Sequence, residues 1–233
     1  MPISVGSGWN VNGGWQGDTA VFPIQFLVVG GGGGGGGGGS GGGAATGARG
    51  GTGAVASVTR TDATVGLTYT ILVGSGNAGG PQQNQFGVQG GPSQVNPGPG
   101  VTVLCNGGGG GNPGSGGIPG AAVPSAVTPA SAPIGGPGSP TPAGLASSIT
   151  GTAVTYGAGS SYGAGGPGGA GNNTTGGPGA RGTPGVVIVS IPTVNFPGTA
   201  TGAVITTPPL TPGQTILTYN APPTTPASYT FTT

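Results

Sequence analysis

The stretch Ile24-Gln25-Phe26-Leu27-Val28-Val29 runs directly into ten consecutive glycines, Gly30 to Gly39, followed by Ser40 and three more glycines. Its first six residues are mostly β-branched, aromatic or otherwise apolar, a pattern typical of a buried strand. The glycine run favours neither an α-helix, where Gly costs about 1 kcal/mol relative to Ala, nor a sheet, to which it contributes no side chain. The sequence therefore predicts a strand that continues directly into a run of residues without side chains.

Gly and Pro dominate the whole chain, with 62 and 25 of its 233 residues, whereas apolar residues make up 33%. This composition cannot fill an ordinary core with large side chains and is typical of disordered, low-complexity proteins. Disordered chains generally stay soluble through a high net charge, but the net charge here is +1. A free, nearly uncharged chain would aggregate, so the composition favours an ordered or assembled state over disorder.

Five residues carry all of the side-chain charge, namely Arg49, Arg60, Arg181, Asp18 and Asp62, and the chain has no Lys, Glu or His. General acid–base catalysis, metal binding and Schiff-base chemistry draw mainly on the missing residue types. We therefore expect a protein that is not an enzyme, with no catalytic residues, no cofactor and no metal. The two aspartates are not placed together by any pattern, which disfavours a two-carboxylate hydrolase.

The same composition limits the partners. Three scattered arginines cannot form the basic stripe that nucleic-acid binding needs, and no apolar run reaches the roughly 20 residues of a membrane-spanning helix. The segment Met1 to Ser4 has neither the basic nor the apolar region of a signal peptide, so we expect synthesis and retention in a cytoplasm. The single cysteine, Cys105, excludes an internal disulfide framework and is expected to be a small buried hydrophobe.

Changes in composition divide the chain into three segments: an N-terminal β or attachment segment at 1–23, a glycine-rich domain at 24–190, and a Thr/Pro-rich β segment at 191–233. No segment has a helical pattern. Alternating or β-branched runs predict further strands, listed here in order: 54–58 and 67–73 as a hairpin with a turn near 62–66, 101–104, a weak pair within 145–156, 186–189, 215–219, and 228–232.

Glycines recur every third residue late in the chain, at Gly163, Gly166 and Gly169, and again at Gly176, Gly179, Gly182 and Gly185. Polyproline II geometry has three residues per turn and no internal hydrogen bonds. When such helices lie side by side, Gly allows the backbones to approach closely enough for N–H···O=C bonds and Cα–H···O contacts between them, and Pro has a compatible φ. We therefore expect an all-β or irregular fold, with a polyglycine II bundle bracketed by short β-strands and no α-helix. A collagen triple helix is disfavoured because the regular triplets are too few.

Four segments occur in the order seen in the glycine-rich domains of bacteriophage tail-fibre and tail-appendage proteins: Phe26 to Val29 with the glycine run, Leu67 to Gly79, Gly144 to Gly157, and Gly185 to Val189. The chain resembles this family over residues 24–190. Some members are similar to distal adhesins, in which a polyglycine II sandwich presents loops that bind the host cell. Residues 112–144 depart from the pattern in being richer in Pro and Ala, and the chain after Pro192 lies outside it.

The resemblance implies a virion structural protein, a tail fibre or fibre-tip adhesin, which is assembled in the host cytoplasm and displayed on the particle surface. Its partners would be other virion proteins and a host-surface glycan or outer-membrane protein. Fibres are usually trimers and open strand edges invite partners, so a homotrimer and a single chain at a fibre tip are both expected assemblies. The alternatives are a decoration or connector protein without a receptor and an ice-binding polyglycine II protein, against which the irregular glycine period speaks.

Receptor contacts are expected on loops at the ends of the glycine helices, because binding residues concentrate on loops held by a rigid scaffold. The candidates, chosen as polar or aromatic groups, are Gln82, Gln83, Asn84, Gln85, Phe86, Tyr156, Tyr162, Asn172 and Asn173. For each of them the alternative is a solvated turn or a residue packed against the bundle. Trp9 and Trp15 are candidates for docking to a partner protein or to the core of the domain.

Overall fold

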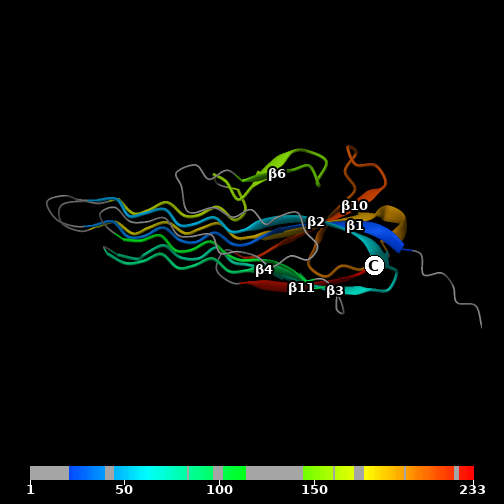
Figure 1. The fold of residues 1–233 in the computed structure, drawn as a ribbon, viewed down its shortest axis with the longest axis horizontal. Helices are drawn as coiled ribbons and strands as arrows, with labels where there is room; N and C mark the ends of the chain where they lie inside the picture. Colours follow the sequence, from blue (N-terminus) through cyan, green and yellow to red (C-terminus); the bar gives the residue numbers. More distant parts are fainter. Residues whose placement is uncertain are drawn as a thin grey trace, which may run out of the picture.

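A computed structural model of the chain describes residues 21–39, 45–82, 84–96, 102–113, 144–159, 161–170, 176–196, 198–222 and 226–233. A β-sandwich lies at one end of these residues, and long glycine-rich tracts extend from it side by side to a free end (Figure 1). Apart from a single 3-10 turn, Thr193–Asn195, the described residues form strands and extended tracts without an α-helix. The expected all-β class is thereby confirmed.

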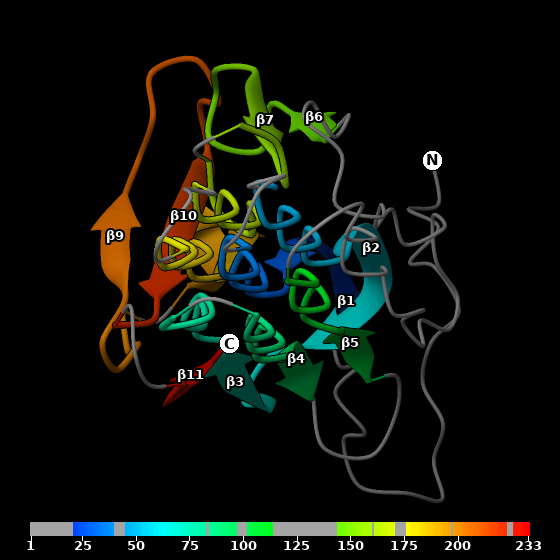
Figure 2. The same ribbon diagram turned by 90° about the vertical axis from the view of Figure 1, so that its left-hand side faces the viewer.

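Two antiparallel sheets form the sandwich. The five-stranded sheet has the order β2 (Val55–Thr64), β1 (Val21–Val29), β8 (Val186–Pro192), β10 (Gln214–Asn220) and β9 (Val204–Thr206). The four-stranded sheet has the order β11 (Ala227–Thr232), β3 (Thr68–Val73), β4 (Ser93–Asn96) and β5 (Val103–Cys105). A separate hairpin, β6 (Leu145–Ser147) and β7 (Val154–Tyr156), lies on the outer face of the larger sheet (Figure 2).

The core between the two sheets follows from the alternation along each strand, since successive side chains of a strand point to opposite faces. Phe22, Ile24, Phe26 and Val28 of β1 point inward and are at most 5% exposed. Aromatic rings fill the centre: Tyr69 and Phe231 stack with centroids 4.5 Å apart. The alternate residues of β1, Leu27 and Val29, belong to a second apolar cluster on the outer face, beneath the β6–β7 hairpin.

Most of the predicted strands are present, but the predicted hairpin between 54–58 and 67–73 is wrong. β2 pairs with β1 in the larger sheet, whereas β3 pairs with β4 and β11 in the smaller one. The turn at Val65 and Gly66, where Gly66 has φ +85°, carries the chain from one sheet to the other. Each strand buries its apolar face against the opposite sheet, β2 over β5 and β3 over β8 and β10, and this burial places the two strands in different sheets.

Strands after the predicted boundary near residue 191 lie in the same sheets as strands before it. β10 pairs with β8 along its whole length, and β11 pairs with β3. Cys105, expected to be a small buried residue, has no exposed surface and is a free cysteine.

Seven glycine-rich tracts lie beside one another in the described part of the chain. Six of them directly continue strands: 30–39 leaves β1, 45–54 enters β2, 74–80 leaves β3, 85–91 leads to β4, 106–112 leaves β5, and 176–185 enters β8. The seventh, 163–170, follows the loop after β7. Because strands of both sheets feed the tracts, the sandwich sets the direction and spacing at which the tracts begin.

The run Gly30–Gly39 lies at the centre of the tracts, and its N–H groups are shared among three neighbours in a three-residue rotation. Gly30, Gly33, Gly36 and Gly39 donate to carbonyls of 45–54. Gly31, Gly34 and Gly37 donate to carbonyls of 85–91, and Gly32, Gly35 and Gly38 donate to carbonyls of 177–183. All ten N···O distances fall between 2.8 and 3.0 Å. All three acceptor tracts run antiparallel to the central one.

The carbonyl groups of the central run are used in a similar way by three parallel tracts. The N–H groups of Asn77, Gly80 and Asn84 donate to the carbonyls of Gly32, Gly35 and Gly38. Those of Gly108 and Gly111 donate to Gly31 and Gly34, and those of Gly166 and Gly169 donate to Gly33 and Gly36. The outer tracts also bond to one another around the ring. Within the described residues, the central run is thus enclosed by six tracts that alternate in direction (Figure 2).

This close packing explains the uninterrupted glycine run. At each position from Gly30 to Gly38, a Cβ atom would lie closer than 3.0 Å to a carbonyl oxygen of a neighbouring tract. Since each obstacle is backbone and not a movable side chain, no other residue fits. An outer tract has close neighbours on its inward side and on its flanks, but not on its outward side, and Ala78 and Pro167 are exposed there.

We expect Gly34→Ala to reduce the free energy of unfolding by about 3 kcal/mol or more, because the new methyl group would overlap the Ala78 carbonyl. Chemical denaturation of the purified variant measures the change. The matched control is Ala78→Ser on the neighbouring tract, an exposed position, which should stay within about 0.5 kcal/mol of the wild type. Equal stability of Gly34→Ala and the wild type would contradict the packing described here.

Candidate functional site

The connection between tracts 74–80 and 85–91 lies at the free end of the bundle, and its backbone is held by the central run. Gly37 donates to the Gln85 carbonyl at 2.8 Å, and the Gly38 carbonyl accepts from the Asn84 N–H at 3.3 Å. Asn84 has φ 55°, a left-handed conformation that asparagine tolerates better than most residues. The central run therefore fixes the backbone at Asn84 and Gln85.

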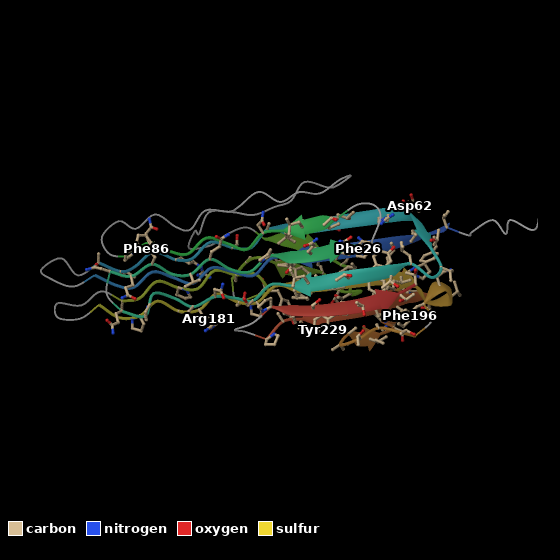
Figure 3. The ribbon with its side chains drawn as sticks, turned by 90° about the horizontal axis from the view of Figure 1, so that it is seen from below. Phe26, Asp62, Phe86, Arg181, Phe196 and Tyr229 are labelled. Carbon is tan, nitrogen blue, oxygen red and sulfur yellow. The ribbon has the colours of Figure 1, made fainter. Side chains whose placement is uncertain are left out.

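The side chains of this turn point their functional groups to solvent. Gln82, Asn84 and Gln85 are exposed, and none of their amides forms a side-chain hydrogen bond within the described residues. Phe86 follows them with 65% of its surface exposed, toward the free end of the bundle (Figure 3). The turn thus presents amide donors and acceptors beside an apolar ring, and it carries no charge.

Tyr156 and Tyr162 lie at the opposite end of the tracts, beside the sandwich. Their rings stack with centroids 6.5 Å apart and an interplanar angle of 17°, and the Gly157 N–H donates to the Tyr162 carbonyl. Tyr156 is 2% exposed in the outer apolar cluster, whereas Tyr162 is 36% exposed. The structure brings these two candidates together, but it does not bring them to the turn that carries Phe86.

The remaining sequence candidates, Gln83, Asn172, Asn173, Trp9 and Trp15, lie outside the described residues. The two tracts that flank Asn172 and Asn173 are joined by a hydrogen bond from the Gly177 N–H to the Ala170 carbonyl. At that point 163–170 and 176–185 have reached the same end of the bundle as the 81–86 turn, since Gly177 also accepts from Gly38.

The hydroxyl groups of buried Ser93 and half-buried Thr183 lie at the junction of sandwich and bundle. Ser93 Oγ donates to the Val29 carbonyl at 2.6 Å and accepts from the Gly74 N–H at 2.9 Å. Thr183 Oγ1 likewise donates to the Ser161 carbonyl at 2.6 Å and accepts from the Ala164 N–H at 2.7 Å. Both satisfy backbone groups where the strand or loop pattern changes to the glycine pattern. A single Ser or Thr in such a segment gives no sequence signal for this role.

The charged residues that the structure describes are Arg49 and Arg181 on the tracts, which donate to the Gly159 and Gly76 carbonyls, and Arg60 and Asp62 on the sandwich. Arg60 and Asp62 form a two-bond ion pair at 2.9 and 3.0 Å on the sandwich, at the opposite end from Phe86 (Figure 3). The hydrogen bond with Arg60 lowers the pKa of the Asp62 carboxyl. The described residues contain no group of three or more His, Cys, Asp or Glu that could hold a metal ion. Within the same residues, no helix has the length and apolar character needed to cross a bilayer.

No protein-family model and no curated protein sequence matches this chain.

The titratable groups of the sandwich predict an unusual dependence of stability on pH. Burial raises the pKa of the hydroxyls of Tyr69, Tyr156 and Tyr219. A group whose pKa is raised by folding stabilises the protein below its unfolded pKa, about 10 for Tyr, and this contribution is lost as the pH rises above that value. With no His or Glu in the chain, we expect the melting temperature to vary little between about pH 5 and 9 and to fall above about pH 10.

The variant Tyr219→Phe tests the assignment of this alkaline loss. The Tyr219 hydroxyl is buried without a hydrogen-bond partner in the described residues, so its removal should leave the protein as stable as the wild type or more stable at pH 7. The fall in melting temperature above pH 10 should also become shallower. A stability transition between pH 5 and 8 in the wild type would contradict the assignment.

Proposed function

We propose that the seven glycine-rich tracts form a polyglycine II bundle. The three-residue rotation of hydrogen-bond partners along Gly30–Gly39 supports this proposal, because polyproline II geometry turns once every three residues. The absence of hydrogen bonds within this run supports it further, since its ten N–H groups all bond to other tracts. At about 3.1 Å per residue, ten glycines would hold the far turn roughly 31 Å from the sandwich.

We further propose that the protein is a bacteriophage virion protein, a tail fibre or fibre-tip adhesin that contacts the host surface. The observation that carries this proposal is the uncharged turn at the free end of the bundle, with exposed Phe86 and three unpaired amides on a backbone held by the central run. Such a surface suits a glycan or a protein loop, because amides donate and accept hydrogen bonds and an aromatic face covers apolar groups. The resemblance to phage glycine-rich domains supports the same class.

In this proposal the two ends of the molecule have different tasks. The bundle holds the binding turn away from the sandwich without a flexible linker, so little conformational entropy is lost when the turn binds. The sandwich end and the segment with Trp9 and Trp15 would attach to other virion proteins. A nearly neutral surface would also make binding insensitive to salt, because exposed charge pairs are the interactions that salt screens.

Binding of the purified protein to susceptible bacteria and to receptor-deficient mutants of the same strain tests the adhesin role. We expect Phe86→Ala to weaken binding to susceptible cells by about tenfold or more, because aromatic anchors dominate such contacts. The stability should stay within about 0.5 kcal/mol of the wild type, since the ring is exposed. Val194→Ala is the control, as Val194 is 92% exposed but lies on the sandwich.

Equal binding to both kinds of cell, or full binding by Phe86→Ala, would contradict an adhesin that binds through this turn. Equal binding together with antibody labelling on the capsid would instead support the decoration or connector role. Thermal hysteresis in solution would support the ice-binding alternative.

A further inference from the structure

A groove lined by seven polar residues, Pro23 and Ile149 lies on the outer face of the five-stranded sheet, away from the turn at the free end of the bundle. Its volume is about 370 Å³, and its walls come from β1, β2, β8, β10 and the turn after β6. Sites for small ligands commonly have volumes of about 300 to 1,000 Å³. The groove is therefore large enough for a ligand of one or two rings.

The groove exists because the outer face of the sheet changes character along the strands. Toward the bundle this face is apolar, with Leu27, Val29 and Ile188, and it is covered by the β6–β7 hairpin. Further along, the same face carries polar residues: Gln25 lies between Thr59 of β2 and Ser190 of β8 as a cross-strand neighbour of both. The hairpin covers the apolar half and leaves the polar half open.

Two loops in contact with each other form one edge of the groove. A Cβ atom built at Gly151 would lie 3.2 Å from Leu210 Cβ and 3.3 Å from Pro208 Cβ, so the turn after β6 packs on the loop before β10. Ile149 on one side is 5% exposed and belongs to the outer apolar cluster. The edge is therefore anchored to the sheet and is not a free flap.

The polar groups of the groove are partly fixed and partly unpaired. Ser190, which is 8% exposed, donates to Gln214 Oε1 at 3.1 Å, and this bond orients the amide and leaves its Nε2 donors unused. The side chains of Gln25 and Thr59 form no hydrogen bond within the described residues. Thr211 Oγ1 is buried without a partner among the same residues, although buried polar atoms are nearly always paired.

We infer that this groove binds an uncharged, hydroxyl-rich ligand, namely a neutral sugar or the end of a neutral oligosaccharide. Hydroxyl and amide groups can both donate and accept, which matches sugar hydroxyls in either sense. No charged residue lines the groove, so an ionic ligand would lose hydration without gaining a counter-charge. Pro23 and Ile149 offer apolar contact for the C–H face of a sugar ring. The site is separate from the proposed receptor-binding turn and does not depend on it.

An array of neutral mono- and oligosaccharides, with sialylated and sulfated counterparts, tests the inference on the full-length protein, and titration calorimetry then measures the affinity of each hit. We expect binding to neutral sugars. Gln25→Leu and Thr59→Val, which remove polar atoms but keep the side-chain size, should each weaken that binding by about tenfold. Thr70→Val is the matched control, because Thr70 is an exposed strand residue of the other sheet, and its affinity should equal that of the wild type.

Melting curves of all three variants should overlay that of the wild type, which separates loss of binding from loss of folding. The inference is overturned if no neutral sugar binds, if only the anionic sugars bind, or if Gln25→Leu and Thr59→Val bind as tightly as Thr70→Val. It is also overturned if Phe86→Ala abolishes the binding of these sugars and the groove variants do not, since the sugar site would then be the turn at the free end.

Discussion

The hydrogen bond from a central glycine N–H to a carbonyl of a neighbouring tract is the interaction on which the rest of the molecule depends. Gly30 to Gly39 each make one, and the acceptor tract changes with every residue, returning after three. This rotation requires close neighbours all around the run, so the run contains glycine alone. An outer tract has such neighbours on its inward side and flanks, and its outward side is open. In 45–54, Gly47, Gly50 and Gly53 are the residues whose added Cβ would strike carbonyls of the central run.

Such a bundle cannot fold without the sandwich. Ordering a residue costs about 1 to 2 kcal/mol of backbone entropy, and glycine more than average, whereas a hydrogen bond contributes only about 0.5 to 1.5 kcal/mol net. The hydrogen bonds of the tracts therefore do not outweigh the entropy lost on ordering them, and the tracts would not fold alone. The stacked rings of Tyr69 and Phe231 and the inward residues of β1 supply conventional burial, and strands of both sheets deliver the tracts already aligned. Ser93 and Thr183 satisfy backbone groups where the two patterns meet.

Local patterns in the sequence predict much of this fold. The apolar runs at 24–29 and 186–189, the weak pair within 145–156 and the alternation after residue 214 all correspond to strands. The strand Ser93–Asn96 was missed because its only β-branched residue is Val95. The placement of β2 and β3 in different sheets could not be predicted from the turn between them, because it depends on which strand faces are buried across the sandwich. The central position of Gly30–Gly39 depends on six tracts that are distant in sequence, and no local pattern contains that information.

The turn at the free end and the groove on the sheet also differ in how far the sequence predicts them. The 81–86 turn is a continuous segment, so its amides and Phe86 could be selected from the sequence, and the structure places those it describes in the open. Tyr156 is a candidate by its residue type, but it lies in the outer apolar cluster, and residue type does not reveal that placement. Gln25, Thr59, Ser190 and Gln214 are spread over almost the whole chain, and only the register of the sheet brings them to one groove.

Amide hydrogen exchange of Gly31 to Gly38 tests most directly whether the glycine backbone is a core. If the run is enclosed as described, these amides should exchange only when the protein unfolds globally, with the same protection as those of Phe26 and Val28 in β1. Exchange of the glycine amides at the rate of an unfolded chain, while β1 stays protected, would contradict the account.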